Sequence, residues 1–254
     1  MSSLKNLKIK VHKLAGRVLL SPLFVNLIGL FYRTKIKHRG CMINVDNEVV
    51  SNKTKARLFY GFYESAELRF IEKYLLDDAD VVELGSSIGV TAREILKKLK
   101  TSKRLICVEA NPFLIKTLEM NVADEIQSGR VVVKNMAVSY DSPEESKKEF
   151  FISKSSLSGS IYESNSGQED GENEVLVSSA TLSSILCEEK IEQFVLVADI
   201  EGAELGIIDS DKEAFKNCNK LIMELHKVSI NGNTWSILDI KEKIEDTLGF
   251  KCID

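Results

Sequence analysis

The sequence predicts an α/β fold with a mostly parallel sheet, because strand-like and helix-like segments alternate along the chain. Residues 81–84 form a short apolar, partly β-branched run that a glycine turn joins to a helix expected over 88–100. A second apolar run, 104–109, follows at the distance that one crossover helix requires. A further run, 195–199, ends in an aspartate, which places a carboxylate at the edge where open α/β sheets bind ligands.

Length and composition fit one α/β domain with a short appendage, or at most two small domains. The chain has 254 residues, of which 44% are hydrophobic and 28% charged, so a sizeable core is expected. A net charge of -4 argues against a general nucleic-acid binder, and we expect no nucleic-acid partner. Five cysteines without C-x-x-C spacing and three dispersed histidines predict neither a disulfide framework nor a metal site. The reducing cytoplasm is therefore the expected location.

Residues 1–40 differ from the rest and predict a basic, partly apolar helical extension before a main domain over 41–254. Within the extension, residues 18–32 are mostly apolar and lie between two clusters of lysine and arginine. This run is shorter than the roughly 20 residues that a spanning helix needs, and it contains Pro22. A helix lying on an anionic membrane surface fits the pattern, and a helix that caps the domain or an oligomer interface fits equally.

The glycine turn after residues 81–84 predicts a ligand site. It does not match the dinucleotide fingerprint G-x-G-x-x-G, because Ser86, Ser87 and Ile88 lie between Gly85 and Gly89. It does not match the P-loop either, because no Gly-Lys-Ser/Thr follows. The N–H groups at the start of the next helix could bind a carboxylate. The carboxylate of Glu83 could bind an ammonium, so the pair suits a zwitterionic amino-acid group.

Other candidate binding residues follow the neighbouring strands. Glu109 ends the second strand, where an acidic residue commonly accepts hydrogen bonds from ribose hydroxyls. The third strand, expected over 130–139, brings Met136 and Ala137 to where an adenine ring could lie. Glu64 precedes the central strand and could line the mouth of a ligand site.

A second group of ionisable residues surrounds the fourth and fifth strands. Asp199, Glu201 and Glu204 lie so close in sequence that some of them must face a ligand, helix N–H groups or a cation. The fifth strand, expected over 220–226, brings His226 towards the same edge. A histidine there is a candidate general base.

Together these stretches resemble the FkbM family of class I S-adenosylmethionine-dependent methyltransferases over residues 61–226. The resemblance implies a Rossmann-like, doubly wound, mostly parallel sheet of seven strands. It also implies methyl transfer from S-adenosylmethionine to an oxygen of a sugar or other small-molecule hydroxyl. The chain departs from the family at Glu83 and Ser86-Ser87, where aspartate and Ala-Asn are usual, and at Ala198 and Ser183, where lysine and aspartate are common. The motifs that carry the resemblance are Glu83-Leu-Gly-x-x-x-Gly89, Val108-Glu-Ala-Asn-Pro112, Asn135-Met-Ala-Val-Ser139, Thr181-Leu182, Asp199-Ile-Glu-Gly-Ala-Glu204 and Met223-Glu-Leu-His226.

The resemblance also implies roles for individual residues, and two other functions stay open. A nucleotide-dependent α/β oxidoreductase and a non-catalytic methyltransferase-like binding module are the alternatives. We expect no metal, and the oligomeric state is not predicted. The expected catalytic residues are His226, Asp199 and Glu201, and the expected cofactor-binding residues are Glu64, Glu83, Gly85, Ser87, Gly89, Glu109, Ala110, Asn111, Met136, Ala137 and Asp199.

Overall fold

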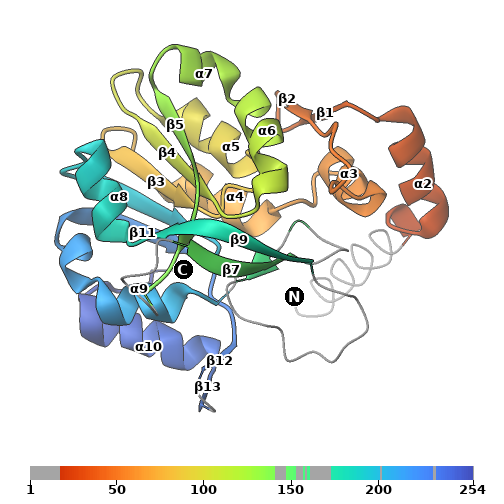
Figure 1. The fold of residues 1–254 in the computed structure, drawn as a ribbon. Helices are drawn as coiled ribbons and strands as arrows, with labels where there is room; N and C mark the ends of the chain where they lie inside the picture. The colour runs from red at the N-terminus through yellow and green to blue at the C-terminus, as the bar shows by residue number, and fades with distance from the viewer. Residues whose placement is uncertain are drawn as a thin grey trace, which may run out of the picture. The chain divides into compact units, whose positions relative to one another are not determined.

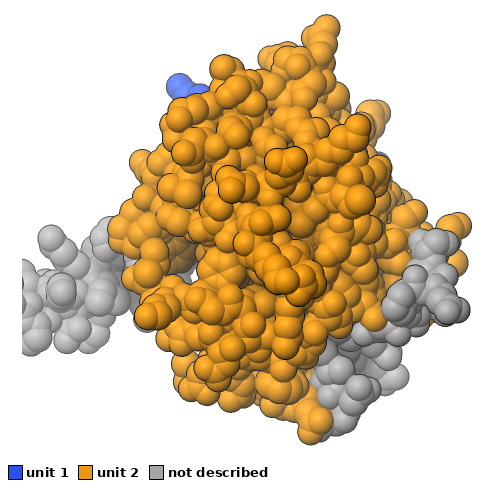
Figure 2. Space-filling view, turned by 90° about the vertical axis from the view of Figure 1, so that its left-hand side faces the viewer, with its two compact units in different colours: residues 1–65 blue, residues 66–254 orange. Residues whose placement is uncertain are grey.

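The chain forms two compact units, residues 1–65 and residues 66–254, and Figure 2 shows the surface of the second in orange. The structure of each unit is that of a computed structural model. It describes residues 18–140, 147–152, 157, 159–160, 173–200, 202–230 and 233–253.

The described part of the first unit, residues 18–65, contains two helices and a two-stranded hairpin before α4 (Ser65–Tyr74) begins. Helix α2 packs against α3 through Ile28 and Gly29, since a Cβ on Gly29 would lie 2.1 Å from the side chain of Asn52. The sequence predicted a hairpin within residues 41–51, but its turn lies earlier, at Arg39 and Gly40, which both have positive φ. The predicted domain division after residue 40 falls in this turn. The elements are α2 (Pro22–Phe31), β1 (Lys35–His38), β2 (Cys41–Asn44) and α3 (Asn52–Phe59).

A five-stranded parallel sheet forms the centre of the second unit (Figure 1). Its order is β11-β10-β3-β4-β5, so the chain runs outward from β3 and then returns to the other side of it. This order is consistent with the predicted Rossmann-like fold, whereas the predicted count of seven strands is not confirmed in the part of the chain described. The strands are β3 (Asp80–Leu84), β4 (Leu105–Glu109), β5 (Val131–Asn135), β10 (Phe194–Ala198) and β11 (Cys218–Met223).

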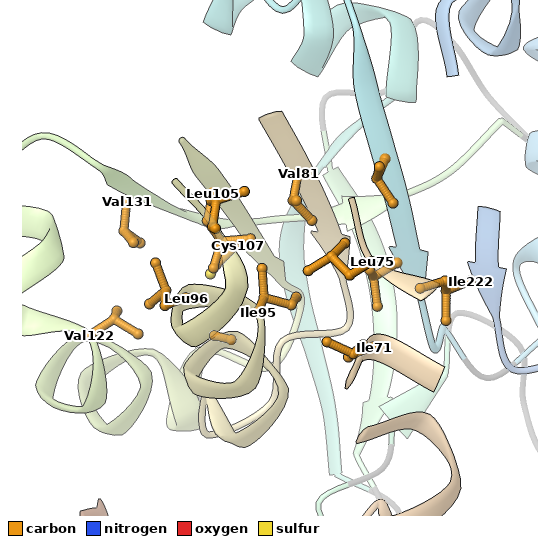
Figure 3. Packing of buried hydrophobic residues seen from close by; sticks show 14 of the residues in the cluster. Ile71, Leu75, Val81, Ile95, Leu96, Leu105, Cys107, Val122, Val131 and Ile222 are labelled. Atoms are coloured by element: carbon orange, nitrogen blue, oxygen red, sulfur yellow. The ribbon is translucent and has the colours of Figure 1, made fainter. Parts of the chain in front are cut away.

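Helices cover both faces of this sheet because its strands carry apolar side chains on both sides. Figure 3 shows Ile71, Ile95 and Val122 packed with Val81 and Cys107 on one face. The opposite face packs against α8, α9 and η1. The helical elements of the unit are α4 (Ser65–Tyr74), α5 (Val90–Lys98), α6 (Pro112–Asn121), α7 (Ala123–Gln127), α8 (Leu182–Glu189), α9 (Glu204–Ser210), η1 (Lys212–Asn217) and α10 (Ile237–Leu248), and a hairpin joins β12 (Val228–Ile230) to β13 (Asn233–Trp235).

A second, smaller sheet interrupts the strand that the sequence predicted over 130–139. The strand breaks at Met136, so that β5 belongs to the central sheet and β6 to the smaller one. Ala137, Phe150 and Val177 form the core of the smaller sheet. Most of the long polar loop expected over 153–170 lies outside the described residues. The strands in spatial order are β6 (Ala137–Val138), β9 (Asn173–Ala180), β7 (Lys147–Ile152) and β8 (Gly159–Ser160).

Candidate functional site

The carboxyl ends of β3 and β10 mark the point where the chain changes direction across the sheet. Open α/β sheets bind ligands at such a point, because the loops from the two neighbouring strands diverge there. The backbone N–H of Asp199 donates to the carbonyl of Leu84 at 2.9 Å, and that of Gly85 donates to the carbonyl of Val108 at 2.9 Å. These bonds hold the ends of β10, β3 and β4 together.

Gly85 and Gly89 are required by the protein's own packing. Gly85 has φ +86°, and a Cβ there would lie 1.9 Å from the backbone oxygen of Asp199. Gly89 has φ +83°, and its Cβ would lie 2.8 Å from Cδ1 of Leu118. The sequence predicts glycine at these positions for backbone freedom and for access by a ligand. The structure shows the positive φ together with a close approach of the polypeptide itself.

Glu83 lies inside the second unit with only 1% of its surface exposed. Alternation along β3 places its side chain on the same face as Val81 and Cys107. Its Oε2 accepts hydrogen bonds from Ser86 Oγ (2.8 Å) and Cys107 Sγ (3.3 Å). Burial raises the pKa of Glu83 to about 7, and these two bonds oppose the shift. Its Oε1 is buried and has no hydrogen-bond partner among the described residues.

Glu109 joins the glycine turn to the loop that follows β4. Its Oε2 accepts from the backbone N–H of Ser87 (2.6 Å), and its Oε1 accepts from that of Asn111 (2.7 Å). Burial raises the pKa of Glu109 to about 7, against the effect of these bonds. Each carboxylate oxygen keeps a second acceptor site, so the group can still accept from ligand hydroxyls.

The other predicted cofactor-binding residues lie in several environments. Asn111 is fully buried and caps α6 by accepting from the N–H of Phe113. Ala110 and Ala137 pack in the core of the smaller sheet, and Met136 packs against the face that α8 covers. Glu64 belongs to the first unit. The cofactor roles of these residues stay predictions.

A buried glutamate holds His226 beyond the end of β11. Nδ1 of His226 lies 2.9 Å from Oε1 of Glu204, the first residue of α9, whose side chain is fully buried. Nε2 lies 3.7 Å from Oδ1 of Asp199 and 4.0 Å from Oε1 of Glu224. A carboxylate only accepts hydrogen bonds, so Nδ1 carries a hydrogen and donates it to Glu204, and Nε2 faces the carboxylates of Asp199 and Glu224.

The structure thus brings Asp199 and His226 together, as the sequence predicted, and adds Glu204. The third predicted catalytic residue, Glu201, lies outside the described residues. Of the acidic residues after Asp199, the sequence pointed to Glu201 as a catalytic residue, and Glu204 was not selected as a site residue. The sequence did contain a signal for Glu204. Three carboxylates close together in the sequence need compensating partners, and His226 was the candidate partner at this edge of the sheet.

Two of the departures from the family, Ser183 and Ala198, occupy packed positions. Ser183 donates its backbone N–H to Oδ2 of Asp211 (2.8 Å), and its hydroxyl donates to the same carboxylate. The hydroxyl of Tyr140 donates to that Oδ2 as well (2.7 Å). Ala198 is buried against the helices of the α8 face. Ser183 therefore joins the start of α8 to the end of α9.

Comparison with known proteins gives one family match. A family model described as the methyltransferase FkbM domain matches residues 83–252, more than half of the chain. The solved structures that match include a candidate transferase of Pyrococcus horikoshii, which is 20% identical and aligns with a TM-score of 0.30. That alignment covers 39% of this chain and 34% of the P. horikoshii chain. No curated protein matches.

Proposed function

Because the chain belongs to the FkbM methyltransferase domain family, we propose that it transfers a methyl group from S-adenosylmethionine to a hydroxyl oxygen of a carbohydrate-type small molecule. The family implies a methyl donor. The observation that carries the finer proposal is the pairing of Glu204 with His226, 2.9 Å apart, beside Asp199 at the carboxyl edge of the sheet. This pairing supports transfer to an oxygen, since a hydroxyl must lose its proton to become a methyl ether.

The residues at the end of β3 fit S-adenosylmethionine. The buried Oε1 of Glu83 and Oγ of Ser87 have no hydrogen-bond partners among the described residues, and such atoms suit the polar methionine end. The N-terminus of α5 offers backbone N–H groups to the carboxylate of the methionine moiety. Glu109 would accept from the ribose hydroxyls. When bound, the sulfonium supplies an electrophilic methyl group, so the protein's contribution is mainly alignment of the acceptor.

In this proposal His226 is the general base. Its Nε2 would accept the proton of the acceptor hydroxyl, and the Glu204 carboxylate would stabilise the resulting imidazolium. Asp199 and Glu224 are partly exposed and flank Nε2. Paired carboxylates can accept from neighbouring hydroxyls, which supports an acceptor with several hydroxyl groups.

Two other functions make different predictions. A nicotinamide-dependent oxidoreductase would shift its melting temperature or the fluorescence of Trp235 when NAD(H) is added. A non-catalytic binding module would bind S-adenosylhomocysteine but transfer no labelled methyl group to any member of a broad panel of sugars and glycosides. The methyltransferase proposal requires binding together with transfer.

Glu109→Ala is expected to weaken S-adenosylhomocysteine binding by roughly 150-fold or more, since two hydrogen bonds to a charged group, about 1.5–3 kcal/mol each, are lost. Isothermal titration calorimetry, run well below the melting temperature of the variant, measures the change. Glu119→Ala is the matched control, because Glu119 is exposed on α6. This variant should bind S-adenosylhomocysteine with the affinity of the wild type. Equal affinities for wild type and Glu109→Ala would contradict the ribose assignment.

Glu204→Gln is expected to lower kcat by about 10-fold to 100-fold without changing S-adenosylhomocysteine affinity. The amide can donate to Nδ1 and favour the wrong tautomer, and it removes the charge that stabilises the imidazolium. Steady-state kinetics on wild type, both single variants and the Glu204→Gln/His226→Ala double variant measure the coupling. Because Glu204 acts through His226, its substitution should cost little once His226 is absent. Fully additive losses would show that Glu204 has a separate role.

A further inference from the structure

The outward side of α2 is an exposed apolar surface. Leu23, Phe24, Leu27, Leu30 and Phe31 are between 38% and 74% exposed. At 100° per residue these five positions cover a single arc of roughly 120° on the helix. The buried residues Ile28 and Gly29 lie on the other side, where α3 packs. An apolar arc of this kind is characteristic of a surface that contacts a partner.

The segments that flank α2 in the sequence are rich in positive charge. Residues 1–65 contain 12 lysine and arginine residues and only 3 acidic ones, although the whole chain has a net charge of -4. No acidic residue occurs before Asp46. Directly after α2 come Arg33, Lys35, Lys37 and Arg39, whose side chains are exposed. The first unit therefore combines an apolar helix face with a basic border.

We propose that α2 binds in the plane of an anionic membrane surface, with its apolar arc in the acyl boundary and the basic residues at the lipid headgroups. A basic amphipathic helix binds such surfaces through apolar burial together with attraction to anionic lipids. Nucleic acid would match the positive charge, but it offers no apolar phase to cover five exposed leucine and phenylalanine side chains. Among the described residues, no helix is long and apolar enough to cross a bilayer.

Vesicle flotation of the full chain tests the proposal. The protein should float with vesicles of mixed phosphatidylserine and phosphatidylcholine, and much less with phosphatidylcholine alone. Raising the salt concentration from about 0.1 M to 1 M should weaken binding, because the screening length falls from about 10 Å to about 3 Å. Lys35→Glu/Lys37→Glu should weaken binding by at least about 30-fold, since each basic residue contributes about a fivefold effect.

Leu23→Glu tests the apolar arc and should weaken vesicle binding by about tenfold or more. Leu238→Glu is the matched control, because both leucines are 68% exposed and Leu238 lies on α10 of the other unit. Both variants should keep the wild-type melting temperature, since neither side chain is buried. Sedimentation velocity on the same samples reports the oligomeric state.

Several results would overturn the proposal. Absence of flotation, or equal flotation with neutral and anionic vesicles, would exclude an anionic lipid surface as the partner. If Leu23→Glu and Leu238→Glu weakened vesicle binding equally, the apolar arc of α2 would have no specific role in that binding. A dimer that Leu23→Glu converts to a monomer, without vesicle binding by either, would assign the arc to a second copy of the chain. Release from vesicles by an oligonucleotide would assign the basic border to nucleic acid.

Discussion

His226→Ala is expected to lower kcat by about 10²-fold to 10⁴-fold while S-adenosylhomocysteine binds as it does to the wild type. The variant removes the imidazole ring that Glu204 orients at the edge of the sheet. The proposed base is then absent, so the acceptor hydroxyl would keep its proton. The measurement is transfer of labelled methyl to an acceptor found in the panel, under saturating conditions, alongside calorimetry. The separation of turnover from binding is the informative result.

Lys227→Ala is the matched control for this experiment, because it truncates the exposed neighbouring side chain. It should leave both turnover and binding unchanged. If His226→Ala turns over at the wild-type rate, His226 is not the base. If it instead loses cofactor affinity and turnover together, the Glu204–His226 pair has a role in shaping the cofactor site.

Gly85→Ala should reduce the free energy of unfolding by about 3–5 kcal/mol and lower the melting temperature by roughly 10 °C. Two costs add. A side chain at φ +86° is strained, and its Cβ would lie 1.9 Å from the backbone oxygen of Asp199, which cannot swing aside as a flexible side chain would. Relief requires the ends of β3 and β10 to separate. Urea denaturation monitored by circular dichroism measures the loss.

Gly129→Ala separates these two costs. Gly129 also has a positive φ, +73°, but nothing lies within 4 Å of the position of its Cβ. Its substitution should therefore cost only about 1–2 kcal/mol, the price of the left-handed conformation. Equal losses at the two positions would show that the contact with Asp199 is relaxed without cost.

Local pattern was enough to place three strands of the central sheet, whereas the strand expected over 220–226 is observed at Cys218–Met223 and ends before His226. The runs at 81–84, 104–109 and 195–199 are apolar because helices cover both faces, and their observed ends differ from the predicted ones by a residue or so. The sequence analysis assigned no element after His226. A signal was available there, since Ser236 and Asp239 form a capping box ahead of the apolar pair Ile240 and Ile244.

The break at Met136 could not be read from the sequence. Residues 130–139 form one continuous β-compatible run, and local propensity does not reveal which sheet each half joins. The pairing of β6 with β9 decides it, through residues about 40 positions further along the chain. Local propensity also does not reveal how many strands join the central sheet, which has five in the described part of the chain where seven were expected.

By itself, the sequence determined the alternation of strands and helices, the glycine turn, the methyltransferase family and the edge of the sheet where acidic residues gather. These follow from periodicity and from the shared direction of parallel strands, which are properties of short segments. Only the tertiary structure decided that Glu204 holds His226 from 22 positions away, that Glu83 turns inward to Ser86 and Cys107, and that Glu109 ties down the glycine turn. Which donor a carboxylate meets depends on how separate segments pack, because burial removes water and leaves each charge to the partners that the fold supplies.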